Sequence, residues 1–96
     1  MSKKMAPIHP GEHLAEFLDD YGITAYRLAK DTHVRQTRIS EILKGKRSIS
    51  ADSALRFSKY FGTSAQYWLN LQAHYDMEVA RDALGDELDS ISTCAA

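Results

Sequence analysis

The sequence predicts an all-α domain of five helices and no β-strand. Apolar residues recur at spacings of three, four and seven, which places them on one face of a helix. Glycine follows four of these apolar segments and serine or threonine precedes three of them, as expected at helix ends and helix starts. The chain has 96 residues, 44% hydrophobic and 26% charged, so its size and composition indicate a single globular domain.

The first helix is expected at residues 10–21. Pro10 suits the first helical position, since its missing N–H would have no partner there and its fixed φ is already helical. The apolar side chains of this segment share one face and form a buried stripe: Leu14, Phe17, Leu18 and Tyr21. Gly22 ends the helix because glycine adopts the left-handed conformation without strain.

The second and third helices are expected at residues 24–31 and 36–44, joined by the short segment 32–35. Thr24 caps the second helix and Gly45 ends the third. The side chains expected to face the core are Leu28 and Ala29 from the second helix, and Ile39, Ile42 and Leu43 from the third. Two short helices joined by such a turn have the geometry of a helix-turn-helix.

The fourth helix is expected at residues 51–61 and the fifth at residues 64–84, with Gly85 at its end. In the fourth helix the predicted inward side chains are Ala54, Leu55, Ser58 and Phe61. Residues 1–84 therefore form one helix-turn-helix domain. Residues 85–96 form a polar, acidic tail that we expect to be mobile.

The beginning of the fifth helix is apolar on nearly every side. Its apolar residues point in different directions around the helix: Tyr67, Trp68, Leu69 and Leu71. Because one domain of this size covers only one side of a helix, we expect these four residues to form a homodimer interface. The alternative is that Trp68 fills the core of the monomer.

Positive charge is concentrated in the middle of the chain, although the net charge is −1. Residues 24–60 contain nine Lys or Arg and three Asp or Glu, a net charge of +6, whereas residues 1–23 carry −2 and residues 61–96 carry −5. This asymmetry indicates one surface for a polyanion and another for a different partner. Solvated charge without a function is the alternative when charge alone is considered.

The third helix carries the side chains that can read DNA bases. In a helix-turn-helix the second helix of the motif lies in the major groove. The base-reading candidates are Gln36, Thr37, Arg38, Ser40 and Glu41. Glutamine can bond to adenine, threonine can contact thymine, arginine can reach guanine or a phosphate, and glutamate can accept from cytosine. An ordinary surface helix with charged ends is the alternative.

Three basic residues, Lys44, Lys46 and Arg47, stand at and just beyond the end of this helix. At this point the chain is expected to pass the sugar-phosphate backbone of the DNA. Contacts of this kind hold the protein in register without reading the sequence. We therefore expect these three side chains to bind phosphate.

The segment LAKDTHVRQTRIS resembles the helix-turn-helix of the phage-repressor-like (Xre) family. Three further segments resemble, in this order, the HigA-type antitoxins of that family, over residues 9 to about 80: HPGEHL, RISEILKGKRSISADSALRFSKYFGTS and QYWLNLQAHYD. The resemblance implies a five-helix phage-repressor-like domain that forms a homodimer and binds its own double-stranded operator DNA as an autorepressor. It also implies a second partner, a RelE-like mRNA-cleaving toxin that this antitoxin neutralises.

The helix-turn-helix departs from the family pattern at its turn. His33 replaces a glycine, and a left-handed histidine costs about 1 kcal/mol unless a contact compensates. Arg35 replaces the serine that caps the third helix, so Thr32, water or a DNA phosphate must serve the free N–H groups. We expect Arg35 to bind phosphate. Thr24 and Ala25 at the start of the second helix are also phosphate-binding candidates, Ala25 only through backbone N–H groups.

Other functional classes have little support in the sequence. A stand-alone Xre-family transcriptional repressor without a toxin partner is the alternative to the antitoxin, and a small enzyme or metal-binding module is the third hypothesis. His9 and His13 are four residues apart, but a zinc site needs more ligands. No Ser/His/Asp or Cys/His set stands out. We expect no enzymatic activity, no metal and no cofactor.

The sequence also favours a cytoplasmic protein. No apolar segment approaches the roughly 18 residues that a membrane helix needs, and the first residues lack the apolar stretch of a secretion signal. Cys94 is the single cysteine and cannot form an internal disulfide, which suits a reducing compartment. In the tail, without a neighbouring base, it is expected to be an incidental thiol.

Overall fold

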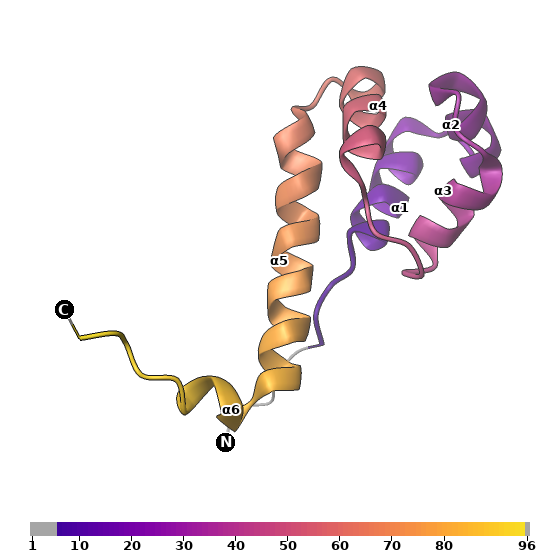
Figure 1. The fold of residues 1–96 in the computed structure, drawn as a ribbon. Coiled ribbons are helices and arrows are strands. Elements are labelled where there is room, and N and C mark those ends of the chain that lie inside the picture. The colour runs from indigo at the N-terminus through magenta and orange to yellow at the C-terminus, as the bar shows by residue number, and fades with distance from the viewer. Residues whose placement is uncertain (1–5, 96) are drawn as a thin grey trace.

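A computed structural model describes residues 6–95, which contain helices and no β-strand (Figure 1). The helices are α1 (Pro10–Tyr21), α2 (Ala25–Thr32), α3 (Gln36–Leu43), α4 (Ala51–Phe61), α5 (Ala65–Leu84) and α6 (Asp86–Asp89). The predicted all-α fold is confirmed, and each of the five expected helices begins and ends within one residue of its expected position. The short helix α6 is an addition, since it lies in the segment expected to be a mobile tail.

Local signals in the sequence explain where these helices begin and end. The hydroxyl groups of Thr24, Ser50 and Ser64 each accept a hydrogen bond from the backbone N–H three residues later, at 3.0–3.2 Å. Each bond satisfies one of the N–H groups that a helix start leaves without a partner. At the other end, Gly22 and Gly62 adopt left-handed conformations with φ of 64° and 76°.

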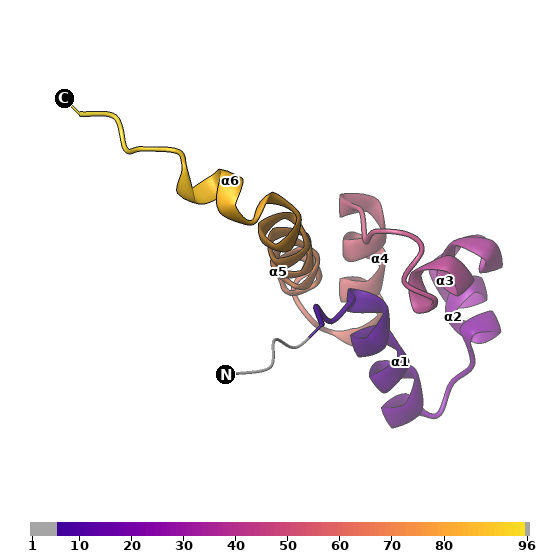
Figure 2. The same ribbon diagram turned by 90° about the horizontal axis from the view of Figure 1, so that it is seen from below.

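The helices form three layers. Figures 1 and 2 both show α5 on one side, α1 and α4 in the middle, and α2 and α3 on the side away from α5. The core lies between these layers and draws side chains from all five long helices. Its members with no exposed surface include Leu14, Leu28, Ile39, Ile42, Ala54, Phe57 and Trp68. Helices α2 and α3 therefore have one face anchored in the core and an outer face that no other helix of residues 6–95 covers.

Trp68 belongs to the core of the single chain. Its ring packs on three phenylalanines at centroid distances of 5.0–6.0 Å: Phe17, Phe57 and Phe61. Its Nε1 donates to Thr63 Oγ1 at 2.8 Å. The expectation that Trp68 forms a dimer contact is wrong, since a side chain with no exposed surface cannot touch a second chain. The alternative, a tryptophan that fills the monomer core, is what the structure shows.

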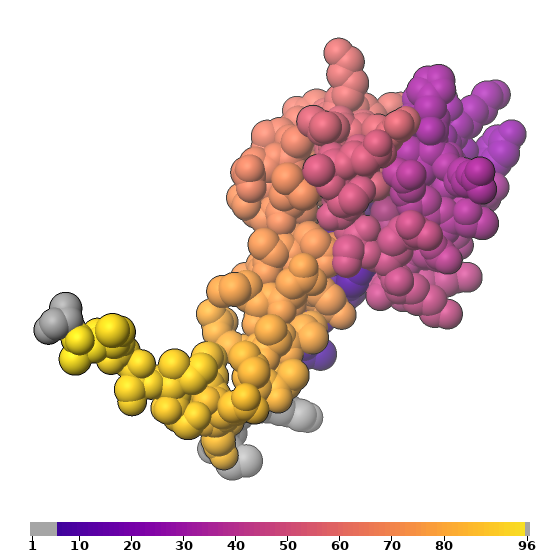
Figure 3. Space-filling model, viewed as in Figure 1, coloured from indigo at the N-terminus to yellow at the C-terminus, as the bar shows by residue number. Residues whose placement is uncertain are grey.

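The exposed apolar surface of α5 lies further along the helix than expected. Leu69 and Leu71 are partly buried against the core, and Tyr67 packs on the Trp68 ring while remaining 37% exposed. The more exposed apolar side chains are Met77, Val79 and Leu84, at 42–56%. The half of α5 that carries them extends beyond α1 and α4 and leads into α6, as Figures 1 and 3 show.

Leu55 corrects the expected inward face of α4. It is 61% exposed, whereas Ala54 and Phe57 are completely buried. The buried stripe follows Ala54, Phe57 and Phe61, at spacings of three and four, and the residue next to Ala54 is turned about 100° away from it. No helix within residues 6–95 is both long and apolar enough to span a membrane.

Candidate nucleic-acid interface

Helix α3 has one face in the core and one face outside it. Ile39 and Ile42 are completely buried and attach the helix to α1 and α2. Gln36 and Thr37 are exposed, and Ser40 and Glu41 are partly exposed one turn later. Residues four apart lie on the same side of a helix, so these four polar side chains form a continuous outer face. The structure thus brings together four of the five base-reading candidates.

The fifth base-reading candidate, Arg38, is directed towards α4. Its Nη1 donates to Asp52 Oδ1 at 2.9 Å and to Ser53 Oγ at 3.4 Å, and its side chain is 32% exposed. Asp52 also accepts from Arg56, and the two hydrogen bonds, that of Arg56 first, hold the pKa of Asp52 below its ordinary value. Arg38 therefore serves as a link between α3 and α4 in this conformation.

The start of α2 has exposed backbone N–H groups that can bind an anion. Thr24 Oγ1 accepts from the N–H of Arg27 at 3.1 Å. The N–H groups of Ala25 and Tyr26 have no acceptor among the described residues, because the helical pattern of hydrogen bonds begins after them. A helix start of this kind attracts an anion through free N–H groups and the positive end of the helix dipole.

The start of α3 also has free backbone N–H groups, and Arg35 adds a positive charge beside them. Arg35 occupies the cap position without a side-chain cap, as expected, and its side chain is exposed. The alternative that Thr32 caps this helix is wrong, because no N–H group at the start of α3 donates to a side chain of the described residues. Thr32 Oγ1 instead donates to the carbonyl oxygen of Leu28 at 2.6 Å. The N–H groups of Gln36 and Thr37 are thus left without an acceptor among the described residues, next to a guanidinium group.

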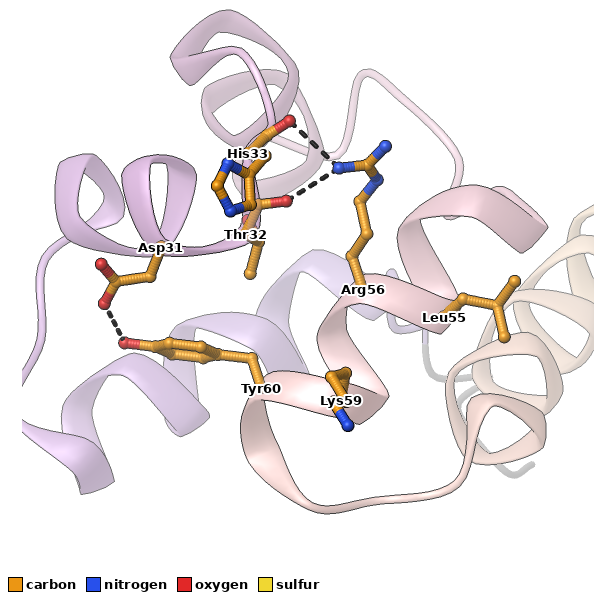
Figure 4. Close-up of a pocket in the computed structure, with 7 residues that line it drawn as sticks. All are labelled: Asp31, Thr32, His33, Leu55, Arg56, Lys59 and Tyr60. Carbon is orange, nitrogen blue, oxygen red and sulfur yellow. Dashed lines mark hydrogen bonds between the residues drawn. The ribbon is translucent and has the colours of Figure 1, made fainter.

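The turn between α2 and α3 has the expected left-handed histidine. His33 has φ 61° and ψ 41°, and it is the one residue other than glycine with a positive φ within residues 6–95. Arg56 of α4 supplies a compensating contact: its Nη1 donates to the carbonyl oxygens of Thr32 at 2.9 Å and His33 at 3.1 Å. Figure 4 shows this guanidinium between the turn and α4.

The loop after α3 has a defined conformation that presents its basic residues. The N–H of Lys46 donates to the carbonyl of Glu41 at 2.8 Å, and the N–H of Gly45 donates to that of Ile42 at 3.0 Å. With Gly45 at φ 74°, these two bonds form a Schellman motif. Lys44 and Lys46 are exposed and form no ion pair with another described residue.

Arg47 in this loop pairs with Glu41 on the outer face of α3. The Nη2–Oε1 distance is 2.7 Å, and both side chains remain about half exposed, at 51% and 45%. An exposed pair of this kind contributes little to stability. It does orient both side chains, so that a base-reading candidate and a phosphate-binding candidate act as one unit. The sequence suggested separate tasks for them.

The imidazole of His9 lies beside Gly45 in this loop, a role that the sequence did not indicate. It caps α1 through Nδ1, which accepts from the N–H of Gly11 at 2.9 Å, and its ring lies edge-on to Tyr75 at 4.8 Å. A side chain added at Gly45 would lie only 3.6 Å from the imidazole. Burial lowers the pKa of His9, against the opposing effects of Asp76, Glu12 and the backbone of Arg47.

No group of three or more His, Cys, Asp and Glu side chains within residues 6–95 is arranged to hold a metal ion. The outer face of α3, the free N–H groups at the starts of α2 and α3, and the basic loop all lie on the helix-turn-helix. These parts are the ones that contact bases and phosphates in proteins that place a helix in the major groove. Fold and surface together define a DNA-binding helix-turn-helix protein.

Comparison with known proteins supports a DNA-binding helix-turn-helix protein and identifies a narrower family within that class. The helix-turn-helix family model matches residues 14–68. Virulence-associated protein I of Dichelobacter nodosus is 50% identical over 78 residues, which cover 80% of this chain and 72% of that protein. A solved structure of an addiction module antidote protein of the HigA family from Coxiella burnetii is 44% identical, with a TM-score of 0.89 over 95% of this chain and 100% of that one.

A second solved structure, the Pseudomonas aeruginosa antitoxin HigA with the higBA promoter, is 41% identical. It has a TM-score of 0.87 over 93% of this chain and 99% of that chain. The chain belongs to the HigA-type antitoxins of the helix-turn-helix family.

Proposed function

We propose that this protein is the antitoxin of a type II toxin–antitoxin pair, which represses its own operator as a dimer and neutralises a RelE-like mRNA-cleaving toxin. The observation that carries the DNA-binding part is the polar outer face of α3, which belongs to a helix-turn-helix that also has free N–H groups at both helix starts and a basic loop after α3. The solved Pseudomonas aeruginosa HigA structure was obtained with promoter DNA, which supports the same role for this chain.

Within the interface, base reading falls to Gln36, Thr37 and Ser40. These side chains form no hydrogen bond with another residue of the range 6–95 and stand on the outer face of α3. Phosphate binding falls to Lys44, Lys46, Arg35 and the N–H groups at the start of α2, including that of Ala25. Glu41 and Arg47 enter the groove as a pair, so that Arg47 directs which acceptor lone pairs Glu41 offers to a cytosine amine.

The dimer contact is proposed for the projecting half of α5. Met77 and Leu84 are 56% and 42% exposed and lie two turns apart, on one side of the helix. A second copy packed on this side in two-fold fashion would cover apolar surface that one chain leaves in water. The dimer would place two α3 helices about 34 Å apart, so the operator would be a pseudo-palindrome with half-sites one turn apart or a multiple.

Toxin neutralisation is proposed for the acidic end of the chain. Residues 61–96 carry a net charge of −5, and the acidic side chains of α6 are exposed. A ribonuclease that binds mRNA has a basic surface, and a negative surface on the antitoxin would steer the two together. In three dimensions this charge lies at the end of the molecule away from α2 and α3, so DNA and toxin would occupy separate surfaces (Figure 1).

Two measurements test the two parts of the proposal separately. The chain is first used to select duplexes from a random-sequence pool, and enrichment of a pseudo-palindrome supports the repressor role. The chain is then co-expressed with the protein encoded in the adjacent reading frame, with growth and a pull-down as readouts. Restored growth together with co-purification supports the antitoxin role. Enrichment of a duplex without any effect on growth would instead identify a stand-alone repressor.

A further inference from the structure

Helix α3 begins at a weak point of the fold. Its first residues follow a turn in which His33 is held in the left-handed conformation, and Arg35 provides no side-chain cap. Because the helix has only eight residues, a small rotation about its buried residues Ile39 and Ile42 would move Gln36 and Thr37 relative to a bound duplex. The N–H of Val34 donates to the carbonyl of Ala29 at 3.0 Å within the turn, and a contact from outside the helix-turn-helix would restrict this rotation further.

Arg56 of α4 makes that connection. Its Nη1 donates to the two carbonyl oxygens of the turn, those of Thr32 at 2.9 Å and His33 at 3.1 Å. The Nε of the same side chain donates to Asp52 Oδ1 at 2.7 Å, and this bond keeps the guanidinium aimed at the turn. In Figure 4 the Arg56 side chain reaches from α4 up to both carbonyl groups.

Asp52 extends the connection to the recognition helix itself. The same oxygen, Oδ1, also accepts from Arg38 Nη1 at 2.9 Å. One carboxylate on α4 therefore joins an arginine that holds the turn to an arginine on α3. One turn of helix after Arg56, the Tyr60 hydroxyl donates to Asp31 Oδ2 at 2.7 Å and attaches the end of α2 to α4 as well.

We infer that Arg56 is a positioning residue for DNA recognition, which fixes the orientation of α3 without touching the DNA. It does so by holding the carbonyl groups of the turn and, through Asp52, by holding Arg38. The inference rests on the proposed DNA-binding function and deepens it. The bonds join partly exposed groups, with the Arg56 side chain 38% and the Asp52 side chain 54% exposed, so they add little to global stability. Their effect is on geometry, and base contacts depend more steeply on geometry than phosphate contacts do.

Arg56→Met tests the inference, because methionine keeps the aliphatic part of the side chain and removes all its donors. Lys59→Met is the matched control. Lys59 and Arg56 line the same pocket between α4 and the turn, but Lys59 forms no hydrogen bond with the turn, so its replacement removes only a positive charge. The probes are the duplex that wild-type protein enriches from a random-sequence pool and a scrambled duplex of the same composition. Affinities are measured over a series of salt concentrations, well below the unfolding midpoint of each variant.

Arg56→Met is expected to bind the enriched duplex about tenfold more weakly, the effect of losing charge-assisted hydrogen bonds from one site. Binding of the scrambled duplex and the salt dependence stay unchanged, because no phosphate contact is lost. Lys59→Met leaves the ratio of the two affinities as in wild type. Arg56→Lys, which keeps the charge but offers a single donor atom, falls between wild type and Arg56→Met.

A second background tests whether Arg56 acts through the turn. His33→Gly removes the strain of the left-handed turn, because glycine adopts this conformation freely. In that background Arg56→Met is expected to weaken binding of the enriched duplex less than it does in the wild-type background. An undiminished effect would overturn the proposed route through the turn.

The remaining outcomes separate this inference from the proposed function. If Arg56→Met flattens the salt dependence by about one contact per half-site, Arg56 binds phosphate directly and the inference is wrong. If Arg56→Met and Lys59→Met behave alike on an enriched duplex, the inference also fails while the DNA-binding function stands. If wild-type protein enriches no duplex, the proposed function itself is overturned.

Discussion

His9 Nδ1 accepts a hydrogen bond from the backbone N–H of Gly11 at 2.9 Å, and this bond ties the protonation state of one buried imidazole to the start of α1. The same imidazole packs against Tyr75 of α5 and beside Gly45 in the basic loop. Gly11 itself lies so close to the carbonyl of Ile42 that a Cβ would be 1.9 Å from the oxygen. The start of α1 is thus the place where α1, the end of α3 and α5 meet.

The first prediction concerns the pH dependence of stability. Burial lowers the pKa of His9 in the folded protein below its ordinary value of 6.5, so the unfolded chain binds this proton more readily. The contribution of neutral His9 is complete above pH 6.5 and is lost as the pH falls through the lowered folded pKa. Urea unfolding between pH 5 and 8 should therefore show wild type losing stability on the acidic side.

His9→Asn is the matched variant for this prediction. Asparagine is a good helix cap without a proton to gain, so the difference in unfolding free energy between variant and wild type should shrink or reverse at low pH. Because both proteins share His13, His33 and His74, a difference between them that depends on pH reports on His9. A difference that is independent of pH would show that His9 does not titrate in this range.

Arg35→Ser is expected to change stability and DNA binding in opposite directions. Serine can cap α3, where Arg35 provides no side-chain bond, so the free energy of unfolding should rise by about 1 kcal/mol. The loss of a cation at this helix start should weaken binding of the enriched duplex and reduce its salt dependence. Unchanged affinity and salt slope would show that Arg35 does not meet a phosphate.

Gln36→Ala is expected to relax discrimination at one base position by about 1–3 kcal/mol, because a bidentate contact with a base edge is lost. The measurement is a comparison of the wild-type duplex with duplexes substituted at each position in turn. Lys46→Ala is the control. It should weaken all sequences alike and flatten the salt dependence by about one contact per half-site. An altered base preference in Lys46→Ala would contradict this separation of roles.

Met77→Asp is expected to weaken self-association while leaving the fold intact, because Met77 is 56% exposed in the single chain. Analytical ultracentrifugation at several concentrations measures the effect. Leu55→Asp is the matched control, since it places the same charge at another exposed apolar position, on α4. Equal dissociation by Met77→Asp and Leu55→Asp would place the dimer contact elsewhere.

Trp68→Ala should instead lower the free energy of unfolding by about 3–5 kcal/mol, as expected for a buried aromatic side chain.

The helices could be predicted from the sequence because their limits depend on neighbours along the chain. Thr24, Ser50 and Ser64 are followed by the N–H groups that they cap, and Gly22 and Gly62 stand where a left-handed residue ends a helix. The left-handed His33 could be anticipated only from the resemblance to the Xre family, whose pattern has a glycine at this position. The outer face of α3 followed from its periodicity, since burial of Ile39 and Ile42 places Gln36 and Thr37 outside.

Contacts between helices were beyond the reach of the sequence. Arg38 could reach a base or a phosphate as far as its chemistry is concerned, and only the position of α4 puts Asp52 and Ser53 within its reach. Trp68 stands in a segment that is apolar all round, so periodicity does not indicate which side is buried. The packing of α5 on α1 and α4 decides this, and it moves the exposed apolar surface to the far half of the helix.

The sequence by itself determined the helices, the helix-turn-helix and the chemistry available on its outer face, because each depends on interactions within a few residues. The tertiary structure decided which of those side chains are free to meet a partner. Arg56 and His9 gain their roles only through folding, which brings Arg56 to the carbonyl of His33, 23 residues away, and His9 to the ring of Tyr75. Such pairings depend on how helices pack, and the pattern of residues along one helix does not specify the distance to a residue on another helix.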